Sequence, residues 1–146
     1  MFIITRKYLF SAAHRLEGHP KCSRCHGHNY VVTVTLNAEA LEDGMVLDYS
    51  KMDAVIKPII DRYDHRYLVS RENRNLSDPY AEIALRNGDA VDLPVDRSTA
   101  ECIAFLLYEL IEASVKSVSS IQVDETEKSS ALYVHEVHSA QTMFKV

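Results

Sequence analysis

The sequence predicts an α+β protein whose elements follow the order ββααββ, with the strands in an antiparallel sheet. Two features predict this class. Segments 2–13, 29–39, 118–124 and 131–137 are rich in β-branched and aromatic residues or alternate in polarity, as strands do. Between the two pairs lie two segments whose apolar residues recur at spacings of three and four, as on one face of a helix. Runs of strands around paired helices are typical of α+β folds.

Each predicted helix has a recognisable start. The first begins at Ser50, because Ser50 and Asp53 resemble a capping box. Its apolar face comprises Met52, Val55, Ile56, Ile59, Ile60 and Tyr63. Pro58 should kink this helix, because proline removes a hydrogen-bond donor and crowds the preceding turn. The second helix spans about 98–117 and also begins with a capping box.

Two other stretches carry weaker signals. Segment 68–97 is interpreted as a long connection containing one short helix, since Asp78-Pro79 is a good helix start and Asn87-Gly88 a good stop. Residues 45–49 are expected to form a short extended piece before the first helix.

Length and composition exclude several classes of protein. With 146 residues we expect one domain over 1–146. The chain is 47% hydrophobic and 25% charged, as globular proteins are, and no apolar run reaches the roughly 18 residues of a membrane span. A formal charge of -5 argues against nucleic-acid binding. The apolar stretch 8–13 is too short for a signal peptide, so we expect a cytoplasmic protein with no membrane partner.

The densest group of reactive side chains is segment 22–30 together with His14. If a strand begins near His26, its period of two places His26 and His28 on the same face, where both imidazoles can approach one ion. Gly27 then leaves the space between them free. His14 ends the preceding strand, and an antiparallel neighbour can bring its ring to the same point. Three neutral nitrogen ligands with an open fourth position are the arrangement of catalytic zinc.

Other interpretations of this cluster stay open. Any one of the histidines alone is more often a polar residue of a loop or a strand start. Cys22-Ser23-Arg24-Cys25-His26 also fits the CxxCH pattern of c-type haem attachment, although that attachment requires export. A closed structural site of Cys22, Cys25, His26 and His28 is a further alternative. These four ligands are so close in the sequence, however, that little chain is left to place them tetrahedrally around one ion.

The three cysteines favour thiol or metal chemistry over a disulfide framework, because their number is odd and the chain is large enough to fold without disulfide cross-links. If the histidines hold the metal, at least one cysteine stays free beside a divalent charge, which lowers a thiol pKa. That cysteine is a candidate base or nucleophile. Cys102, on the apolar side of the second helix, is expected to be a small buried hydrophobe.

Five short motifs succeed one another along the chain. They are Phe10-Ser11-Ala12-Ala13-His14-Arg15-Leu16, Cys22 with His26-Gly27-His28-Asn29-Tyr30, Gly44-Met45-Val46-Leu47-Asp48-Tyr49, Tyr63-Asp64-His65-Arg66-Tyr67-Leu68 and Val123-Asp124-Glu125-Thr126. In this order they resemble the superfamily of 6-pyruvoyltetrahydropterin and 6-carboxytetrahydropterin synthases, which are pterin enzymes of the tunnelling fold. The resemblance implies a zinc site of His14, His26 and His28, and the family's CxxxHGH spacing makes Cys22 the general base.

The resemblance also assigns roles farther along the chain. Asp64 and His65 would handle a second proton, with His65 exchanging it and Asp64 setting the tautomer. Taken alone, this pair would be a polar helix end. Glu125 would accept hydrogen bonds from the amino and ring N–H groups of a pterin, and Thr99 would contact substrate. Taken alone, Glu125 would be an exposed turn carboxylate.

The activity implied by the resemblance is zinc-dependent conversion of 7,8-dihydroneopterin triphosphate, with loss of triphosphate and no redox cofactor. Carboxy-forming members also release acetaldehyde and yield 6-carboxy-5,6,7,8-tetrahydropterin for queuosine synthesis, whereas pyruvoyl-forming members stop at 6-pyruvoyltetrahydropterin. Three residues between Cys22 and His26 favour the carboxy-forming branch. The implied subunit is a four-stranded antiparallel sheet with two helices on one face. Trimers would close a barrel and pair as homohexamers, with active sites between subunits.

Several features depart from the family pattern. Cys25 is an additional thiol, and it could be a bystander, an oxidation partner for Cys22 or an alternative ligand. Segment 68–97 is longer than expected. Its arginines, which are Arg71, Arg74 and Arg86, are either triphosphate contacts or, as we favour, solvated loop charges. The helix start Ser98-Thr99-Ala100-Glu101 lacks the proline of the family's PTxE motif.

Two rival functions are kept. A non-catalytic zinc-binding scaffold would need none of Cys22, Asp64, His65 and Glu125. Aldol-type cleavage to 6-hydroxymethyldihydropterin occurs in relatives in which a glutamate replaces the cysteine function, so the presence of Cys22 argues against it.

Overall fold

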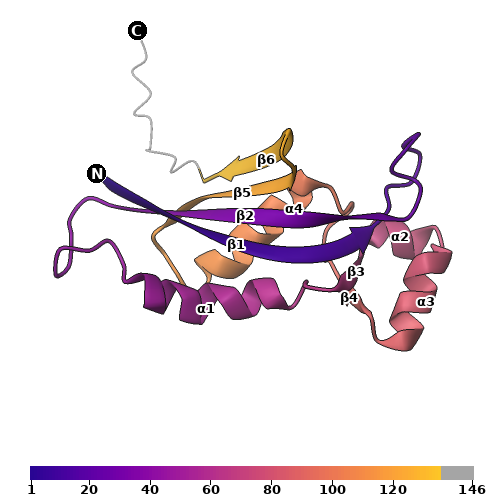
Figure 1. Ribbon diagram of the computed structural model, residues 1–146, viewed down its shortest axis with the longest axis horizontal. Helices are drawn as coiled ribbons and strands as arrows, with labels where there is room; N and C mark the ends of the chain where they lie inside the picture. Colours follow the sequence, from indigo (N-terminus) through magenta and orange to yellow (C-terminus); the bar gives the residue numbers. More distant parts are fainter. Residues whose placement is uncertain (136–146) are drawn as a thin grey trace, which may run out of the picture.

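A computed structural model describes residues 1–135 of the chain, and this part holds six strands and four helices (Figure 1). The strands are β1 (Phe2–His14), β2 (His26–Ala38), β3 (Arg66–Val69), β4 (Ala90–Asp92), β5 (Val118–Thr126) and β6 (Ser129–Val134). The helices are α1 (Tyr49–Asp61), α2 (Arg71–Asn75), α3 (Pro79–Asn87) and α4 (Ala100–Glu112). The α+β class is therefore confirmed. The end of the strand predicted at 131–137 lies outside the described residues.

The strands form one mixed sheet in the order β4-β3-β1-β2-β5-β6. The four strands predicted from the sequence are antiparallel neighbours, as expected. The expected four-stranded, purely antiparallel sheet is nevertheless wrong in detail, because β3 pairs in parallel with β1 and β4 pairs in parallel with β3. Both added strands come from segment 68–97 and its edge. With four and three residues they are too short for a period-two pattern to reveal.

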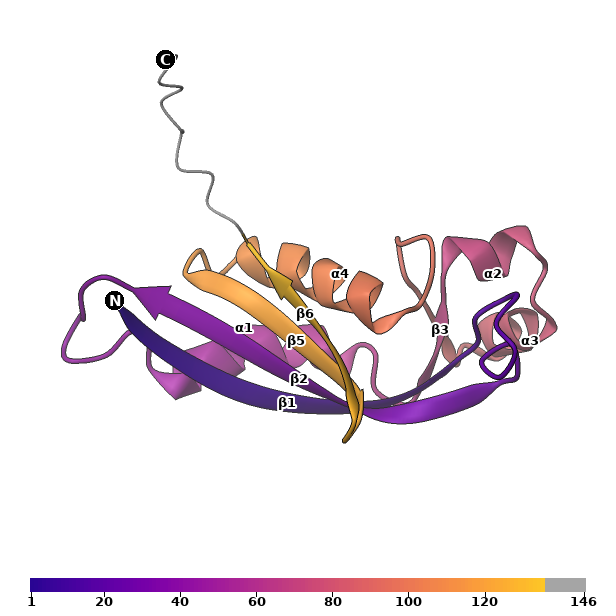
Figure 2. The ribbon, with the colours of Figure 1, turned by 90° about the horizontal axis from the view of Figure 1, so that it is seen from above.

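Helices α1 and α4 are the two predicted ones, and both pack on the same face of the sheet (Figure 2). Each begins one or two residues away from the predicted cap. Asp48 caps α1 by accepting a hydrogen bond from the Ser50 N–H, and Thr99 caps α4 through the Cys102 N–H. Neighbouring Asp, Ser and Thr side chains all suit this position, so the sequence alone does not decide between them. Helix α4 ends at Glu112 rather than near 117.

The long connection is more ordered than predicted. Its one expected helix is confirmed as α3, which has Asp78 at its N-cap, Pro79 as its first residue and Gly88 in the left-handed conformation after it. The short helix α2 is not predicted, because five polar residues carry no apolar periodicity. The extended piece expected at 45–49 is not a strand. Its only ladder contact in the described chain is an isolated bridge between Glu42 and Met45.

The main core lies between the sheet and helices α1 and α4. The inward residues of the helices include Met52, Ile56 and Ile60 of α1 and Ile103, Leu107 and Ile111 of α4. Alternate residues of β1 and β2 point into this core, and Phe10, Ala12, Tyr30 and Val32 are among them. Within residues 1–135, no helix is long and apolar enough to cross a membrane.

Candidate metal centre

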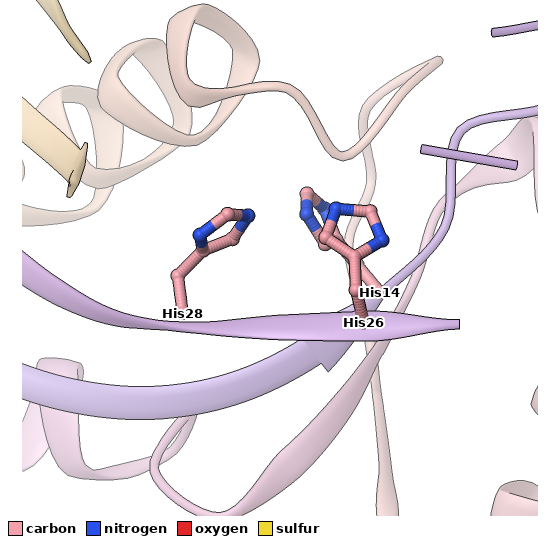
Figure 3. A group of neighbouring side chains, drawn as sticks. All are labelled: His14, His26 and His28. Carbon is pink, nitrogen blue, oxygen red and sulfur yellow. The ribbon is translucent and has the colours of Figure 1, made fainter. Parts of the chain in front are cut away.

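Three histidines meet where β1 ends and β2 begins. In the antiparallel ladder His14 lies opposite His26, and Ala12 lies opposite His28. Paired residues of an antiparallel ladder share a face, so the three imidazoles emerge on one side of the sheet, as Figure 3 shows. One nitrogen atom from each ring lies within 4.8 Å of the other two. This spacing allows all three nitrogens to approach a single metal ion.

Gly27 does not lie between these rings, contrary to the sequence-based expectation. It faces the opposite side of the sheet, where a Cβ atom at this position would lie 2.7 Å from the carbonyl oxygen of Ala12. Its role is therefore to let β1 and β2 approach closely beside the histidines.

Backbone carbonyls orient two of the rings. His14 Nδ1 lies 2.8 Å from the carbonyl oxygen of Ser98, and His26 Nδ1 lies 2.7 Å from that of Arg24. Because a carbonyl oxygen can only accept, each Nδ1 carries the proton and each Nε2 presents its lone pair. Carbonyl partners of this kind fix the tautomer of metal-binding histidines. The donor set therefore fits zinc, which takes neutral imidazole nitrogens readily.

His14 is the most deeply placed of the three, with only 1% of its surface exposed. The pKa of His14 is lowered to about 4, mainly by burial and to a smaller extent by the neighbouring His26 and His28, against the opposing effect of the Ser98 hydrogen bond. The imidazole is therefore neutral at physiological pH, which is the form that binds a metal ion.

Glu125 lies at the same end of the sheet as the histidines. The ladder between β5 and β6 is irregular between Asp124 and Thr126, and the pairing of β5 with β2 ends at Asp124, so Glu125 lies outside both regular ladders. Burial raises the pKa of Tyr30, and the nearby Glu125 charge raises it further. The Tyr30 hydroxyl in turn lies 3.4 Å from His14 Nε2. Tyr30 thus connects the histidine group with the carboxylate predicted to bind substrate, although the sequence alone gives this tyrosine no role.

Asp64 and His65 form the predicted pair, in a tight turn before β3. Asp64 accepts a hydrogen bond of 2.8 Å from the Ser11 N–H and lies 2.9 Å from His65 Nδ1. The pKa of Asp64 is lowered first by the Ser11 N–H and then by His65. His65 has a positive φ of 56° and donates its own N–H to the Ser11 carbonyl at 2.6 Å. The pair is thus held against β1 by two backbone hydrogen bonds.

The structure separates this pair from the histidine group. His65 lines an open pocket of about 590 Å³ together with Ser11, Ala13, Gly27 and Asn29, the residues that alternate with the metal-site positions, and the same pocket also borders Ala12 and His28. Ser11 and Asn29 are paired in the ladder and hydrogen-bonded through their side chains, which places them on one face. Within one chain, His65 therefore lies mainly beside the face of β1 and β2 opposite to the imidazoles, and the pocket reaches the histidine group only at His28.

The cysteines lie outside the histidine group. Among residues 1–135, the atoms that meet within metal-binding distance include no sulfur of Cys22 or Cys25, so the closed thiol site is not formed. Cys22 sits in the loop 15–25, where its N–H donates to His19 Nδ1 at 3.1 Å and its carbonyl accepts from the Leu16 N–H at 2.7 Å. Cys102 is partly buried against the core, close to expectation.

Three other candidate substrate contacts are engaged within the chain. Arg74 makes a two-pronged ion pair with Asp92, and Arg71 pairs with Asp96 at 3.2 Å. These arginines are therefore charges of an exposed segment, which is the interpretation that the sequence favours. Thr99 uses its hydroxyl as the cap of α4.

Comparison with known proteins identifies the family. The family model described as 6-pyruvoyl tetrahydropterin synthase matches residues 3–136. The chain belongs to this family. A 6-carboxy-5,6,7,8-tetrahydropterin synthase from Haemophilus influenzae is 33% identical over 140 residues, covering 91% of this chain and 99% of that protein. The protein of the same name from Synechocystis is 33% identical over 141 residues, covering 91% and 93%.

Solved structures agree with this assignment. The 6-pyruvoyl tetrahydropterin synthase of Caenorhabditis elegans has a TM-score of 0.68 at 26% identity, covering 93% of this chain and 98% of that one. An uncharacterised protein of Wolinella succinogenes has a TM-score of 0.78 at 24% identity, covering 92% and 98%, and shows the same fold. Family membership makes this chain one of a group of pterin-processing lyases.

The burial of His14 predicts a pH dependence of the metal-free protein. Between the ordinary histidine pKa near 6.5 and about 4, the unfolded chain binds a proton at this position and the folded chain does not. Stability from this residue is therefore complete above pH 6.5 and is lost as the pH falls towards 4, by about 3 kcal/mol. Urea unfolding of wild type and His14→Gln with a chelator should show this loss in wild type alone. Parallel pH profiles would contradict it.

Proposed function

We propose that this protein is a zinc-dependent 6-carboxy-5,6,7,8-tetrahydropterin synthase. Its substrates in this proposal are 7,8-dihydroneopterin triphosphate and water, and the other products are triphosphate and acetaldehyde, within queuosine synthesis. The observation that carries the proposal is the convergence of three imidazole nitrogens, from His14, His26 and His28, within 4.8 Å of one another. The names of the relatives, together with three residues between Cys22 and His26, support the carboxy-forming product.

The residues of this chain suit separate tasks in that reaction. A bound zinc ion would polarise the side-chain hydroxyls of a dihydropterin and acidify the neighbouring C–H group. Cys22 is proposed to remove that proton, as a thiolate of the loop beside the histidines. Asp64 fixes the tautomer of His65, which is proposed to return a proton. Glu125 is proposed to accept two hydrogen bonds from the pterin edge.

We further propose that each active site is shared between subunits of a homo-oligomer. The pocket of His65 is bordered mainly by residues of the face of β1 and β2 opposite to the three imidazoles, and of the histidine group it borders only His28, so one chain does not gather His65 and all three histidines at one point. In a closed ring, the face that carries His65 on one chain can meet the histidine face of the next. A trimer or hexamer of this kind would also cover the exposed edge strand β6, where Leu132 and Val134 are more than half exposed.

Two other functions remain as outcomes of the test. The family model and the C. elegans structure carry the name of the pyruvoyl-forming enzyme, which makes 6-pyruvoyltetrahydropterin the alternative product. The second alternative function is that of a non-catalytic scaffold protein that binds zinc.

The experiment that tests the proposal is incubation of the zinc-loaded protein with 7,8-dihydroneopterin triphosphate, followed by mass analysis of the products. We expect 6-carboxy-5,6,7,8-tetrahydropterin and acetaldehyde in equal amounts. Cys22→Ala should bind zinc normally and lose at least about a hundredfold in turnover, the typical contribution of a general base. Cys25→Ser is the matched control and should remain active. A pyruvoyl product would select the alternative, and no consumption would select the scaffold.

A mixing experiment tests the shared site. Cys22→Ala and His65→Ala should each be inactive as pure proteins, because each lacks one half of every site. After co-refolding in equal amounts, about a quarter of the sites should combine two intact halves, so about a quarter of wild-type activity should return. If mixed oligomers form but stay as inactive as their parents, both halves act within one chain and the proposed sharing is wrong.

A further inference from the structure

The segment that carries α2 and α3 lies directly beside the loop 15–25 (Figures 1 and 2), and the proposed reaction assigns it no task. Inside the contact is a set of buried polar side chains. Ser70, Asn73 and Asp78 each have no more than 1% of their surface exposed. Buried polar groups are costly unless they are paired, so a set of this kind indicates a structural or functional demand.

Asp78 is the centre of this set. Its side chain is completely buried, and its carboxylate accepts four hydrogen bonds. The donors are the Tyr80 N–H at 3.0 Å, the Tyr67 hydroxyl at 2.8 Å, Asn73 Nδ2 at 3.1 Å and Arg15 Nη1 at 3.3 Å. Of these donors only Arg15 carries a charge, so it is the partner that offsets burial of the carboxylate.

Arg15 is the residue directly after His14. Its guanidinium contacts both Asp78 and Glu17, and its side chain is only 14% exposed. Its carbonyl oxygen also accepts a hydrogen bond of 3.3 Å from Asn73 Nδ2. The next turn of the loop is held in the same way, because Arg97 Nη2 donates to the Glu17 carbonyl at 2.6 Å. The entry of the loop is therefore fixed through both its backbone and its side chains.

From this geometry we infer that the buried Arg15–Asp78 pair is a positioning element for the metal centre. It anchors the chain immediately after His14, and with it the loop that contains Cys22 and leads into His26. Segment 68–97 thus holds the start of the loop, and the next residue, Ser98, holds the His14 ring. The part that concerns Cys22 rests on the proposed function, whereas the part that concerns metal affinity does not.

Asp78→Asn tests this inference, with Asp92→Asn as the matched control. Asparagine can still cap α3 but removes the charge opposite Arg15, whereas Asp92 pairs with Arg74 at the surface of the same segment. Chelator competition should show zinc bound about tenfold more weakly by Asp78→Asn and unchanged by Asp92→Asn, since outer partners of a metal ligand typically have effects of this size. The absorption spectrum of the cobalt-substituted protein should change in the first variant only.

Arg15→Lys is a second variant that keeps a positive charge opposite Asp78 and so guards against unfolding. A lysine cannot span Asp78 and Glu17 together, so zinc affinity should again fall and iodoacetamide should alkylate Cys22 of the metal-free protein faster. Wild-type affinity and alkylation rate in either folded variant would overturn the inference. Neither measurement uses a pterin, so a failure of the proposed function would leave this test intact.

Discussion

The structure depends above all on the register between β1 and β2. This pairing sets His14 opposite His26 and brings His28 to the same face one pair further along. A shift by one residue would send the three rings to different faces, because side chains alternate along a strand. Gly27 protects this register, since any larger residue would meet the Ala12 carbonyl and push the strands apart. The metal centre therefore depends on the pairing of the two strands more than on any single histidine.

The same alternation explains why one chain is incomplete for the proposed chemistry. The strands have two faces, and the chain places chemically active groups on both. One face carries the histidines with Tyr30 and Glu125 near them, and the other carries Asn29 beside the pocket that His65 lines. Assembly of copies would then join opposite faces of neighbouring chains into one site, which ties catalysis to oligomerisation. The inferred positioning of the loop 15–25 by Asp78 adds a second requirement, because the loop beside the histidines must also be held in place.

Local periodicity in the sequence was enough to predict much of the fold. It locates four strands and the helices α1 and α4. It also locates the histidine group, because the convergence of the three rings needs only a period of two and an antiparallel neighbour. Helix start and stop signals locate α3. It does not predict the short strands β3 and β4, which have too few residues to show a pattern, or the face on which His65 lies, which depends on a turn with positive φ. For Asp78 the sequence indicates only a helix start. The contact of Asp78 with Arg15 joins residues 63 positions apart, which no local pattern reveals.

The most direct test of the account is X-ray absorption at the zinc edge of the metal-loaded protein, because it reports the atoms that bind the ion. The account predicts only nitrogen and oxygen neighbours at about 2.0–2.1 Å, with the imidazole scattering pattern of three histidines. A sulfur neighbour at about 2.3 Å would contradict it, because a cysteine would then complete the coordination shell and could not serve as the base.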